Sequence, residues 1–445
     1  MNTSNYYPGA RGSRPTPLTG TCSAMVLLVA SLAPSTVVWA DGEWQSSVSL
    51  QSEYTDNANR SATDPLSERQ DEVRLSTGGS YENSLLEVSA NYQASETYFE
   101  KDSQENRSQL QGESSLLLGK PHQPLDLLVS HSRRMVLNAP DDLDLLRNND
   151  ERDIFTVSPS ARWRSDGADT VILRATWADI GYRFTPQRDS ERTSGSLSWE
   201  RELSQTSQFN LSAQQSDVSF DAAPFADYKY NAAYAAYSTQ LRQLDYRIQL
   251  GYNESKPELG EGLSSPAYQL NVGYDSGPHQ WNFNASTRIT DNSAGSGNEE
   301  SFEGFNPGDA SSGSLDQLER TSGELSWQTQ VVCGRCSLSV SFYYQDDDYR
   351  VEAEDRQQSG IRINHDYRLS SQASLGFSLD RRNHSFAPDV AREDYRSNRV
   401  GVSYHYRFVQ GLELSVFSNW RDRESDGPAP SYDELRGGLG LTYSF

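Results

Sequence analysis

Long stretches of the chain alternate between apolar and polar residues with a period of two. From Leu244 to Asn253, Leu, Tyr and Ile occupy every second position, and Asp, Arg, Gln, Gly and Asn fill the positions between them. Over 400–408, Val, Tyr and Phe alternate in the same way with Gly, Ser, His and Arg. Successive side chains of a strand point to opposite faces, so this pattern predicts strands with one apolar face and one polar face.

Segments of this kind follow one another along the chain, separated by turn residues. Read in this way, the sequence predicts about 20 strands, within a range of about 18 to 22. They are expected near 44–55, 70–82, 84–98, 106–119, 124–137, 153–165, 169–183, 190–202, 206–220, 226–240, 243–255, 265–275, 279–291, 316–330, 336–350, 355–369, 371–385, 392–408, 411–424 and 432–445.

The predicted fold class is all-β, a single antiparallel up-and-down transmembrane β-barrel. An even number of strands places both of its ends on the periplasmic side. Odd-numbered strands then lead into longer loops, such as 56–69, 138–152, 256–264 and 292–315, and even-numbered strands lead into tight turns, such as 165–168, 275–278 and 409–411. Short periplasmic turns and longer outer loops are typical of bacterial barrels.

The last predicted strand ends in an aromatic residue. From Leu439 to Phe445, apolar or aromatic residues alternate with Gly, Thr and Ser. This ending resembles the closing strand of bacterial outer-membrane barrels, which the barrel-assembly machinery recognises. We therefore predict Tyr443 and Phe445 as an assembly signal. The last strand of a soluble sandwich would show the same alternation.

The N-terminus has the layout of a secretory signal peptide. Arg11 and Arg14 are the only charged residues before Asp41, and an apolar run covers 24–32. Val38 and Ala40 lie at the positions expected before a cleavage site. The apolar run is too short for a membrane-spanning helix. We predict that residues 1–40 are removed by cleavage after Ala40, and that residues 41–445 form a barrel in the cell outer membrane.

The composition fits a barrel with a hydrated interior. The mean hydropathy is −0.75, which is compatible with a barrel because only half of each strand needs to be apolar. The 24 Tyr and 8 Trp are typical of the aromatic girdles at membrane interfaces. The formal net charge of −23 excludes a basic nucleic-acid surface as the main function. Loss of the two signal-peptide arginines moves this charge to about −25.

Two cysteines remain after the predicted cleavage. Cys333 and Cys336 bracket a Gly-Arg pair at a predicted periplasmic turn. Ser337 follows, so the motif lacks the His that haem attachment requires, and two sulfurs alone make a poor zinc site. Because the periplasm is oxidising, we predict a local disulfide, with a redox role as the alternative.

The histidines give no sign of catalysis or of metal binding. The 6 His are scattered along the chain, and none of them forms a pair at metal-ligand spacing. His365-Asp366 and His384-Ser385 would suit a membrane hydrolase, but a nucleophile, a base and an orienting group cannot be assembled from them. We therefore expect no enzyme, no catalytic residue, no cofactor and no metal ion.

Arginines within the predicted strands are the clearest candidate functional residues. An arginine that faces lipid at mid-membrane costs about 2–4 kcal/mol, so most of them should line the lumen. The lumen-lining candidates are Arg174, Arg247, Arg362 and Arg407. Inward carboxylates are expected at Glu324, Asp380 and Glu413. These charges would form either salt-bridge ladders that stiffen the wall or a track for a hydrated anionic solute.

Two short segments carry a family resemblance. Glu53-Tyr-Thr-Asp-Asn57 ends the first predicted strand, and Tyr395-Arg-Ser-Asn-Arg-Val-Gly-Val-Ser403 leads into the final hairpins. Together with the closing Phe445, they resemble the outer-membrane β-barrel porins found with exopolysaccharide loci and with exosortase sorting systems. The resemblance implies an outer-membrane barrel connected with surface polysaccharide, and it assigns no functional residue.

Two functions remain open. The first is a pore or export conduit for a polar solute such as a surface polysaccharide, and the second is a structural or adhesive surface barrel. Expected partners are outer-membrane lipid and lipopolysaccharide, the barrel-assembly machinery during biogenesis and polysaccharide export proteins, but no nucleic acid. Single-channel conductance separates the two functions, because only the first needs an open lumen.

Overall fold

The computed structural model describes residues 42–445, except for 121–122, 138–142, 144, 146–147, 166, 292–314, 352–354, 389, 391–392, 409–410, 426 and 428–430. The signal peptide predicted for residues 1–40 lies outside the described residues, as does its cleavage after Ala40. The described part of the chain contains 20 strands and two short 3-10 helices, η2 (Pro186–Arg188) and η3 (Pro224–Ala226).

Every strand overlaps a segment that the alternation predicts. The largest difference is at β6, which begins at Asn149 instead of 153. The strands are β1 (Gly42–Thr55), β2 (Glu68–Glu82), β3 (Leu86–Phe99), β4 (Arg107–Leu118), β5 (Leu125–Leu137), β6 (Asn149–Arg164), β7 (Asp169–Tyr182), β8 (Ser190–Ser204), β9 (Ser207–Phe220), β10 (Tyr228–Gln240), β11 (Leu244–Pro257), β12 (Leu263–Asp275), β13 (His279–Asp291), β14 (Gln317–Thr329), β15 (Cys336–Tyr349), β16 (Arg356–Arg368), β17 (Ala373–Phe386), β18 (Tyr395–Arg407), β19 (Leu412–Ser425) and β20 (Tyr432–Ser444).

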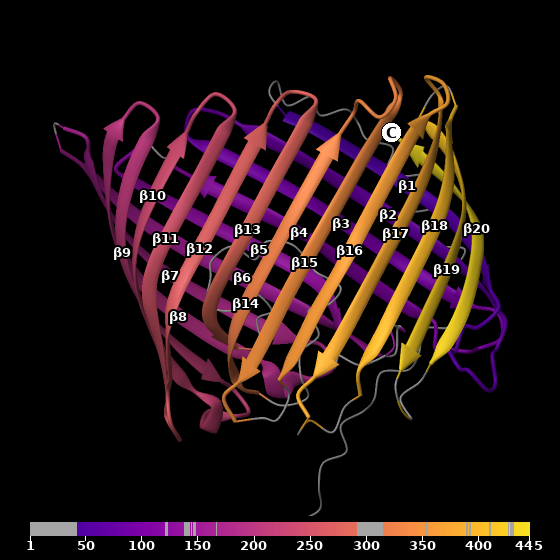
Figure 1. Cartoon of the computed structure of the whole chain (residues 1–445), viewed down its shortest axis with the longest axis horizontal. Helices are drawn as coiled ribbons and strands as arrows, with labels where there is room; N and C mark the ends of the chain where they lie inside the picture. The colour runs from indigo at the N-terminus through magenta and orange to yellow at the C-terminus, as the bar shows by residue number, and fades with distance from the viewer. Residues whose placement is uncertain are drawn as a thin grey trace, which may run out of the picture. The chain divides into compact units, whose positions relative to one another are not determined.

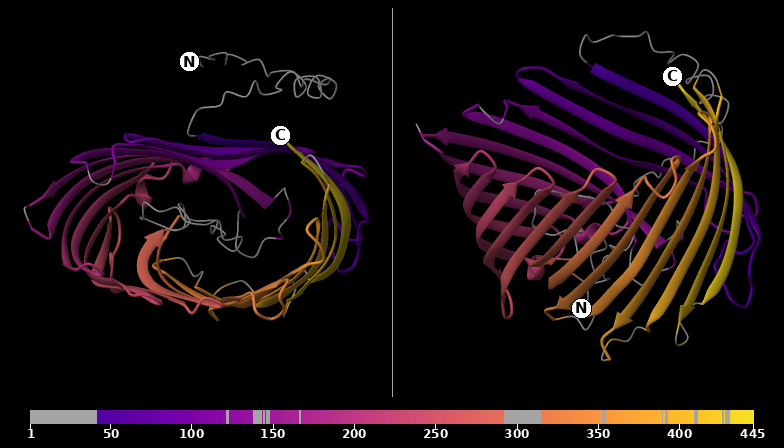
Figure 2. Two further views of the ribbon diagram at one scale, coloured as in Figure 1. Left: turned by 90° about the horizontal axis from the view of Figure 1, so that it is seen from above. Right: turned by 45° about the horizontal axis from the view of Figure 1, so that its top comes forward.

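The strands close into one antiparallel barrel. Each strand pairs with its neighbours in the chain, and β1 pairs with β20 from Ser47↔Ser444 to Thr55↔Arg436. Figure 1 shows the tilted strands of the near wall in front of those of the far wall, and Figure 2 shows the ring from one end. Closure satisfies the sheet edges, which would otherwise leave backbone N–H and C=O groups unpaired in a membrane.

The register brings the apolar positions of neighbouring strands into rows. Ile248 of β11 lies opposite Tyr237 of β10 and Leu270 of β12, and all three side chains lie on the outer face. A shift of one residue would turn the apolar residues of a strand toward the lumen, so the alternation itself specifies this register.

The connections at the two ends of the barrel differ in length, as predicted. Turns from even to odd strands span two residues at 205–206 and six at 119–124 and 330–335. Connections from odd to even strands span five residues at 258–262 and twelve at 56–67, and the longest covers 292–316. The end with the longer connections is called the outer end below, and the other is called the periplasmic end.

Candidate functional site in the barrel lumen

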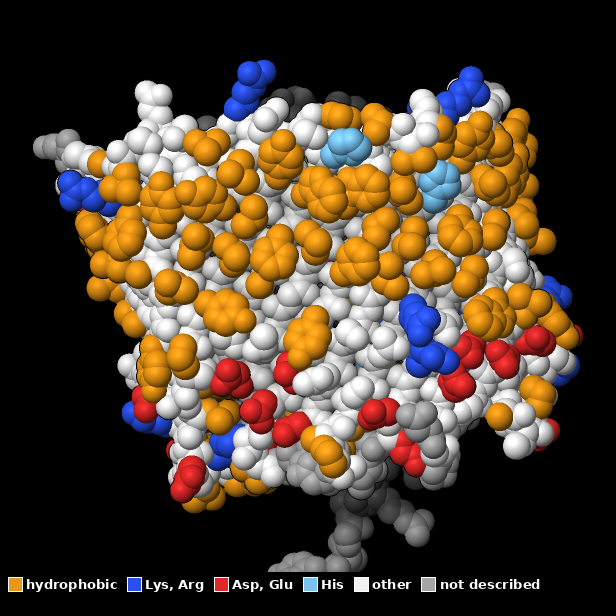
Figure 3. Space-filling view, viewed as in Figure 1, with side chains coloured by type: hydrophobic (Ala, Val, Ile, Leu, Met, Phe, Trp, Pro, Cys, Tyr) orange, Lys and Arg blue, Asp and Glu red, His pale blue; other side chains and the backbone are white. Residues whose placement is uncertain are grey.

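The outer surface carries a broad band of exposed apolar side chains. Leu250, Phe342 and Leu439 are all more than half exposed, and they belong to three different parts of the ring. Figure 3 shows hydrophobic side chains across most of this face and acidic side chains gathered toward the outer ends of the strands. An apolar surface of this extent is unfavourable in water and suits the hydrocarbon of a bilayer.

The outer ends of several strands have the opposite polarity. On β9, the outward residues change from Leu211 and Ala213 to Asp217 near the outer end, while Val218 and Phe220 of the same strand point inward and are buried. The apolar band therefore ends before the strands do, and the outer ends of these strands extend beyond the lipid.

The inner wall is open and polar toward the periplasmic end. One cavity of about 820 Å³ lies along β14–β19 and is lined by Asp366, Arg368, His405, Arg407 and Glu413, among other residues. A second cavity of about 570 Å³ lies along β1–β4, where Ser, Thr, Gly and Asn predominate. Side chains of this kind leave room for water and offer it hydrogen bonds.

The β13–β14 hairpin leaves the wall at its outer end. β12 and β13 pair only from Tyr268↔Thr287 to Asp275↔Gln280, whereas β13 and β14 stay paired as far as Asp291↔Gln317. The freed end of the hairpin bends into the lumen, as the view along the barrel in Figure 2 shows. The lumen is therefore narrower at the outer end than at the periplasmic end.

Polar contacts hold this hairpin end against the inner faces of β8, β10 and β11. Arg192 of β8 donates two hydrogen bonds to the Asp291 carboxylate, at 3.0 and 2.8 Å, and the Tyr228 hydroxyl of β10 also donates to it. Ser255 of β11 donates to the side-chain oxygen of Gln317 at 2.7 Å. Arg192, Tyr228 and Asp291 are all buried, and they are called the Asp291 cluster below.

Apolar packing and a buried amide complete the contact. Ile289 is 1% exposed and belongs to a buried cluster with Val218, Phe220 and Tyr230. The Asn253 side-chain amide is oriented so that its nitrogen donates to Ser265. Its oxygen then accepts a hydrogen bond from the Ile289 N–H at 3.0 Å. This bond satisfies a backbone donor that β12 no longer pairs, which would otherwise be costly to bury.

The β5–β6 hairpin separates from β4 in a similar way. β4 and β5 pair only from Gly112↔Arg133 to Leu118↔Leu127. Asp150, fully buried at the start of β6, accepts hydrogen bonds from the Phe184 N–H at 2.9 Å and the Thr185 hydroxyl at 2.6 Å. The hairpin end is thus tied to the connection between β7 and β8.

Carboxylates held between two arginines recur in the outer half of the inner wall. Asp347 of β15 is fully buried between Arg320 of β14, at 2.7 Å, and Arg356 of β16, at 2.8 Å. Asp380 lies 3.1 Å from Arg362 and 2.7 Å from Arg382, and Glu434 lies 3.0 Å from Arg60 and 2.6 Å from Arg436. A buried charge is tolerable only when it is paired in this way.

The structure places the four predicted lumen-lining arginines on inward positions. Arg174 of β7 lies opposite Ser160 and Ser196, and Arg247 of β11 donates to the Gln249 side chain at 3.1 Å. The Arg362 side chain bonds to Asp380 and is 41% exposed, and Arg407 lies 3.6 Å from Glu413 and is 73% exposed. They are spread along the wall, and the structure does not bring them together into one site.

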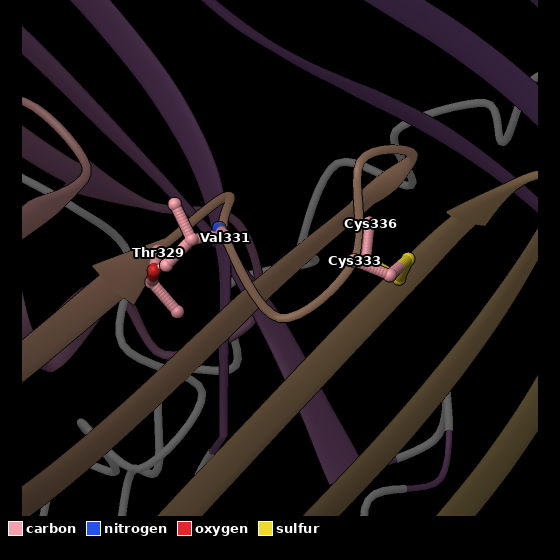
Figure 4. Close-up of a disulfide and its surroundings, with 4 residues drawn as sticks. All are labelled: Thr329, Val331, Cys333 and Cys336. Carbon is pink, nitrogen blue, oxygen red and sulfur yellow. Dashed lines mark hydrogen bonds between the residues drawn. A yellow bond between two sulfur atoms is a disulfide. The ribbon is translucent and has the colours of Figure 1, made fainter.

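The two cysteines form a disulfide in the turn between β14 and β15. Cys333 and Cys336 have a Cα–Cα distance of 5.2 Å, and the Cys336 N–H donates to the Cys333 carbonyl at 3.1 Å. Figure 4 shows the bond at the tip of this turn, where the Val331 N–H also donates to the Thr329 hydroxyl at 3.3 Å.

The closing strand places its aromatic residues at the periplasmic end of the outer surface. Tyr443 and Phe445 are both exposed, and their ring centroids lie 6.0 Å apart. The Phe445 N–H donates to the Ser46 carbonyl at 2.9 Å, so the last residue also takes part in the closing pair of strands. Their predicted recognition by the assembly machinery stays a prediction.

The sequence analysis did not single out the Asp291 cluster. Arg192 and Asp291 are 99 residues apart, and strand alternation carries no information on such a contact. A signal was nevertheless present at the outer ends of β9 and β10. There the tyrosines at 228 and 230 and the apolar residues at 218 and 220 are inward, whereas the outward residues are charged or polar.

No protein-family model and no curated protein matches the sequence. Among solved structures, a ferric enterobactin receptor from Pseudomonas aeruginosa is 9% identical over 91% of this chain and 80% of its own, with a TM-score of 0.48. The FrpB iron transporter from Neisseria meningitidis is 10% identical over 90% of this chain and 81% of its own, with a TM-score of 0.47.

OmpT, an outer membrane protein of Vibrio cholerae, is 10% identical in a form that lacks loop L8, over 91% of this chain and 99% of its own, with a TM-score of 0.37. The strands of this chain close into a 20-stranded barrel, and its apolar outer band suits a bilayer. In the part that the structure describes, no helix combines the length and the apolar character needed to cross a bilayer. Among the same residues, no group of three or more His, Cys, Asp or Glu could hold a metal ion.

Proposed function

We propose that the protein is a conduit through which a polar solute crosses the outer membrane. The observation that carries this proposal is the inner wall of the barrel. Twenty strands enclose more space than side chains can fill, because about eight strands is the size at which they fill the interior. Toward the periplasmic end this wall is lined by small polar and charged residues around cavities of about 820 and 570 Å³.

An oligosaccharide, such as a segment of a surface polysaccharide, is the solute that fits this wall best. Neutral hydrogen-bonding side chains predominate on the inner faces of β11–β13, where the Asn271 amide donates to Asn284 at 2.8 Å. Such amides and hydroxyls can exchange hydrogen bonds with sugar hydroxyls as they do with water. The resemblance to barrels found with exopolysaccharide loci favours the same solute.

The bent hairpins give the conduit its narrowest part. The ends of β5–β6 and β13–β14 enter the lumen at the outer end and are held by buried contacts such as the Asp291 cluster. A solute that enters from the periplasm meets a wide, hydrated vestibule first and this constriction afterwards. We propose that polysaccharide export proteins deliver the solute at the periplasmic mouth, and we assign the barrel no catalytic step.

Single-channel recording tests the conduit directly. The mature chain, refolded in detergent and inserted into planar lipid bilayers, should give discrete conductance steps that a neutral oligosaccharide such as maltohexaose partly reduces. Heat-modifiable migration on gels would verify that the barrel is folded. A folded protein that conducts no current would overturn the proposal and favour the structural or adhesive barrel.

A further inference from the structure

Three pairs of arginines lie directly opposite one another on neighbouring strands. Arg134 of β5 is opposite Arg152 of β6, Arg288 of β13 is opposite Arg320 of β14, and Arg399 of β18 is opposite Arg421 of β19. Side chains at directly opposed positions approach to about 4.5–5.5 Å at Cβ, and like charges placed there are destabilising. Three such pairs in one sheet should therefore lower the stability of the barrel, and a role in function would explain their presence.

Ion pairs of two of these pairs, and the strand register of the third, place all three on the inner face. Arg134 bonds to Glu113 at 2.7 Å, and Arg320 bonds to the buried Asp347. Arg421 lies opposite Glu434, which is also buried. On the inner face these groups meet the water and the solute of the lumen.

The three pairs lie at a similar depth. Arg134, Arg152, Arg288 and Arg320 are each three residues from the outer end of their strand, and Arg399 and Arg421 are four residues from theirs. At a rise of about 3.3 Å per residue, this depth is about 10–13 Å along the strand. Two pairs sit on the hairpins that bend into the lumen, and the third sits on another part of the wall.

The charge around the third pair is positive. By register, the row across β16–β20 runs Arg362, Asp380, Arg399, Arg421, Glu434. Both carboxylates of this row are already held by two other guanidinium groups each, as described above. Arg399 and Arg421 are half-buried on the lumen side and have interactions within the chain, which fix their place in the wall.

We propose that the six arginines of the three pairs form an arginine ring that binds the carboxylate groups of an acidic oligosaccharide in transit. This inference rests on the proposed conduit and names the class of its solute. A carboxylate between two guanidinium groups accepts charge-assisted hydrogen bonds from both, and it removes the repulsion between them.

A sugar chain fits this arrangement better than an acidic peptide does. The wall between the periplasmic mouth and the ring is polar but poor in apolar grooves, since Ser, Asn, Gln and Gly fill many inward positions of β8–β13. Sugar hydroxyls match these groups, whereas the side chains of a peptide would find little apolar surface to contact.

Binding and current block by defined oligomers test the ring. Hexagalacturonate should bind the purified barrel in titration calorimetry and block its current, and maltohexaose should bind at least tenfold more weakly. In the double variant Arg399→Gln/Arg421→Gln, hexagalacturonate binding should weaken by about tenfold or more, while Asp380 and Glu434 keep their two other arginines. Binding to the unchanged protein should fall with rising salt.

A matched control removes the same charge from the outer face. Arg381 of β17 and Arg396 of β18 lie five residues and one residue from the outer ends of their strands, with their side chains turned away from the lumen. The double variant Arg381→Gln/Arg396→Gln should bind hexagalacturonate as the unchanged protein does. Equal losses in both double variants would overturn the proposal.

These experiments distinguish a failure of the arginine-ring proposal from a failure of the conduit proposal. Conductance without hexagalacturonate binding would overturn the ring and leave the conduit in place. Calorimetric binding that depends on Arg399 and Arg421, without conductance, would support the ring and overturn the conduit. A hexaglutamate that binds as tightly as hexagalacturonate would overturn the assignment of the solute as a sugar.

Discussion

Single buried carboxylates hold the outer half of the barrel wall together. Asp347 has no exposed surface, and its two arginine partners come from the strands on either side of it. Removing a charge from water costs several kcal/mol, which only close pairing offsets. One side chain therefore fastens three adjacent strands.

Changing Asp347 to Asn should destabilise the barrel. Arg320 and Arg356 would remain buried on either side of residue 347 without their shared carboxylate, and loss of one partner from such a network costs about 3–5 kcal/mol. Urea unfolding in detergent, followed by tryptophan fluorescence, would measure the loss. Asp217→Asn is the control because Asp217 is exposed, and its effect should stay within about 0.5 kcal/mol. Equal effects of the two changes would contradict this account of Asp347.

The disulfide should matter little to the stability of the barrel. Cys333 and Cys336 close a loop of only four residues, for which the chain-entropy relation gives at most about 2 kcal/mol. The double variant Cys333→Ala/Cys336→Ala should therefore assemble normally. A maleimide reagent added to the denatured, unreduced protein should label no thiol, and labelling of both cysteines would reject the bond.

At the scale of the strand, the closing pair β1–β20 makes the barrel depend on its last residues. Phe445→Asp places a charge on the exposed aromatic end of β20, next to Tyr443. We expect assembly to be impaired and protease-sensitive material to accumulate in the periplasm. Heat-modifiable yield in outer-membrane fractions measures this. Asp433→Asn, an outward change at the other end of β20, should assemble normally; a normal yield of Phe445→Asp would reject the assembly signal.

The bent hairpin gives a second prediction at this scale. Asp291→Asn removes the carboxylate that Arg192 and Tyr228 bind, so the outer end of β13–β14 should be held less firmly. Single channels should then show more frequent current fluctuations and a higher mean conductance than the unchanged protein. Asp217→Asn again serves as the control. Identical recordings from all three proteins would mean that the hairpin end does not limit the current.

The strands could be predicted from the sequence, whereas the bending of the β5–β6 and β13–β14 hairpins into the lumen could not. Alternation is a local property, so Ile248 and its neighbours reveal their strand, its faces and its place in the count. The bend of β13 depends on Ile289 packing against Val218 and on Arg192 reaching Asp291, contacts between distant segments. The inward direction of the arginines followed from the cost of facing lipid, but their opposed pairing requires the register of both strands.

At the scale of the whole molecule, one side of the inner wall carries a charge opposite to that of the chain. Within β14–β20, all of which the structure describes, the inward positions hold ten arginines and six carboxylates, although the chain has a net charge of −23. The arginines are Arg320, Arg356, Arg362, Arg368, Arg382, Arg399, Arg407, Arg421, Arg423 and Arg436, and the carboxylates are Glu324, Asp347, Asp366, Asp380, Glu413 and Glu434. This side of the lumen therefore carries a net positive charge, and the wall there should favour anions.

The ion selectivity of the channel measures the effect of this wall charge. Replacing Arg247 and Arg407 with Gln removes two fixed positive charges from the wall, so the reversal potential in a salt gradient should shift toward cation selectivity. The shift should be largest at low salt, because the Debye length is about 30 Å at 0.01 M and about 10 Å at 0.1 M. The double variant Arg69→Gln/Arg381→Gln changes the same charge on the outer face and should leave the reversal potential nearly unchanged. Equal shifts of the reversal potential in both variants would show that the arginines of the wall do not set the ion selectivity. Cation selectivity of the unchanged protein would show the same.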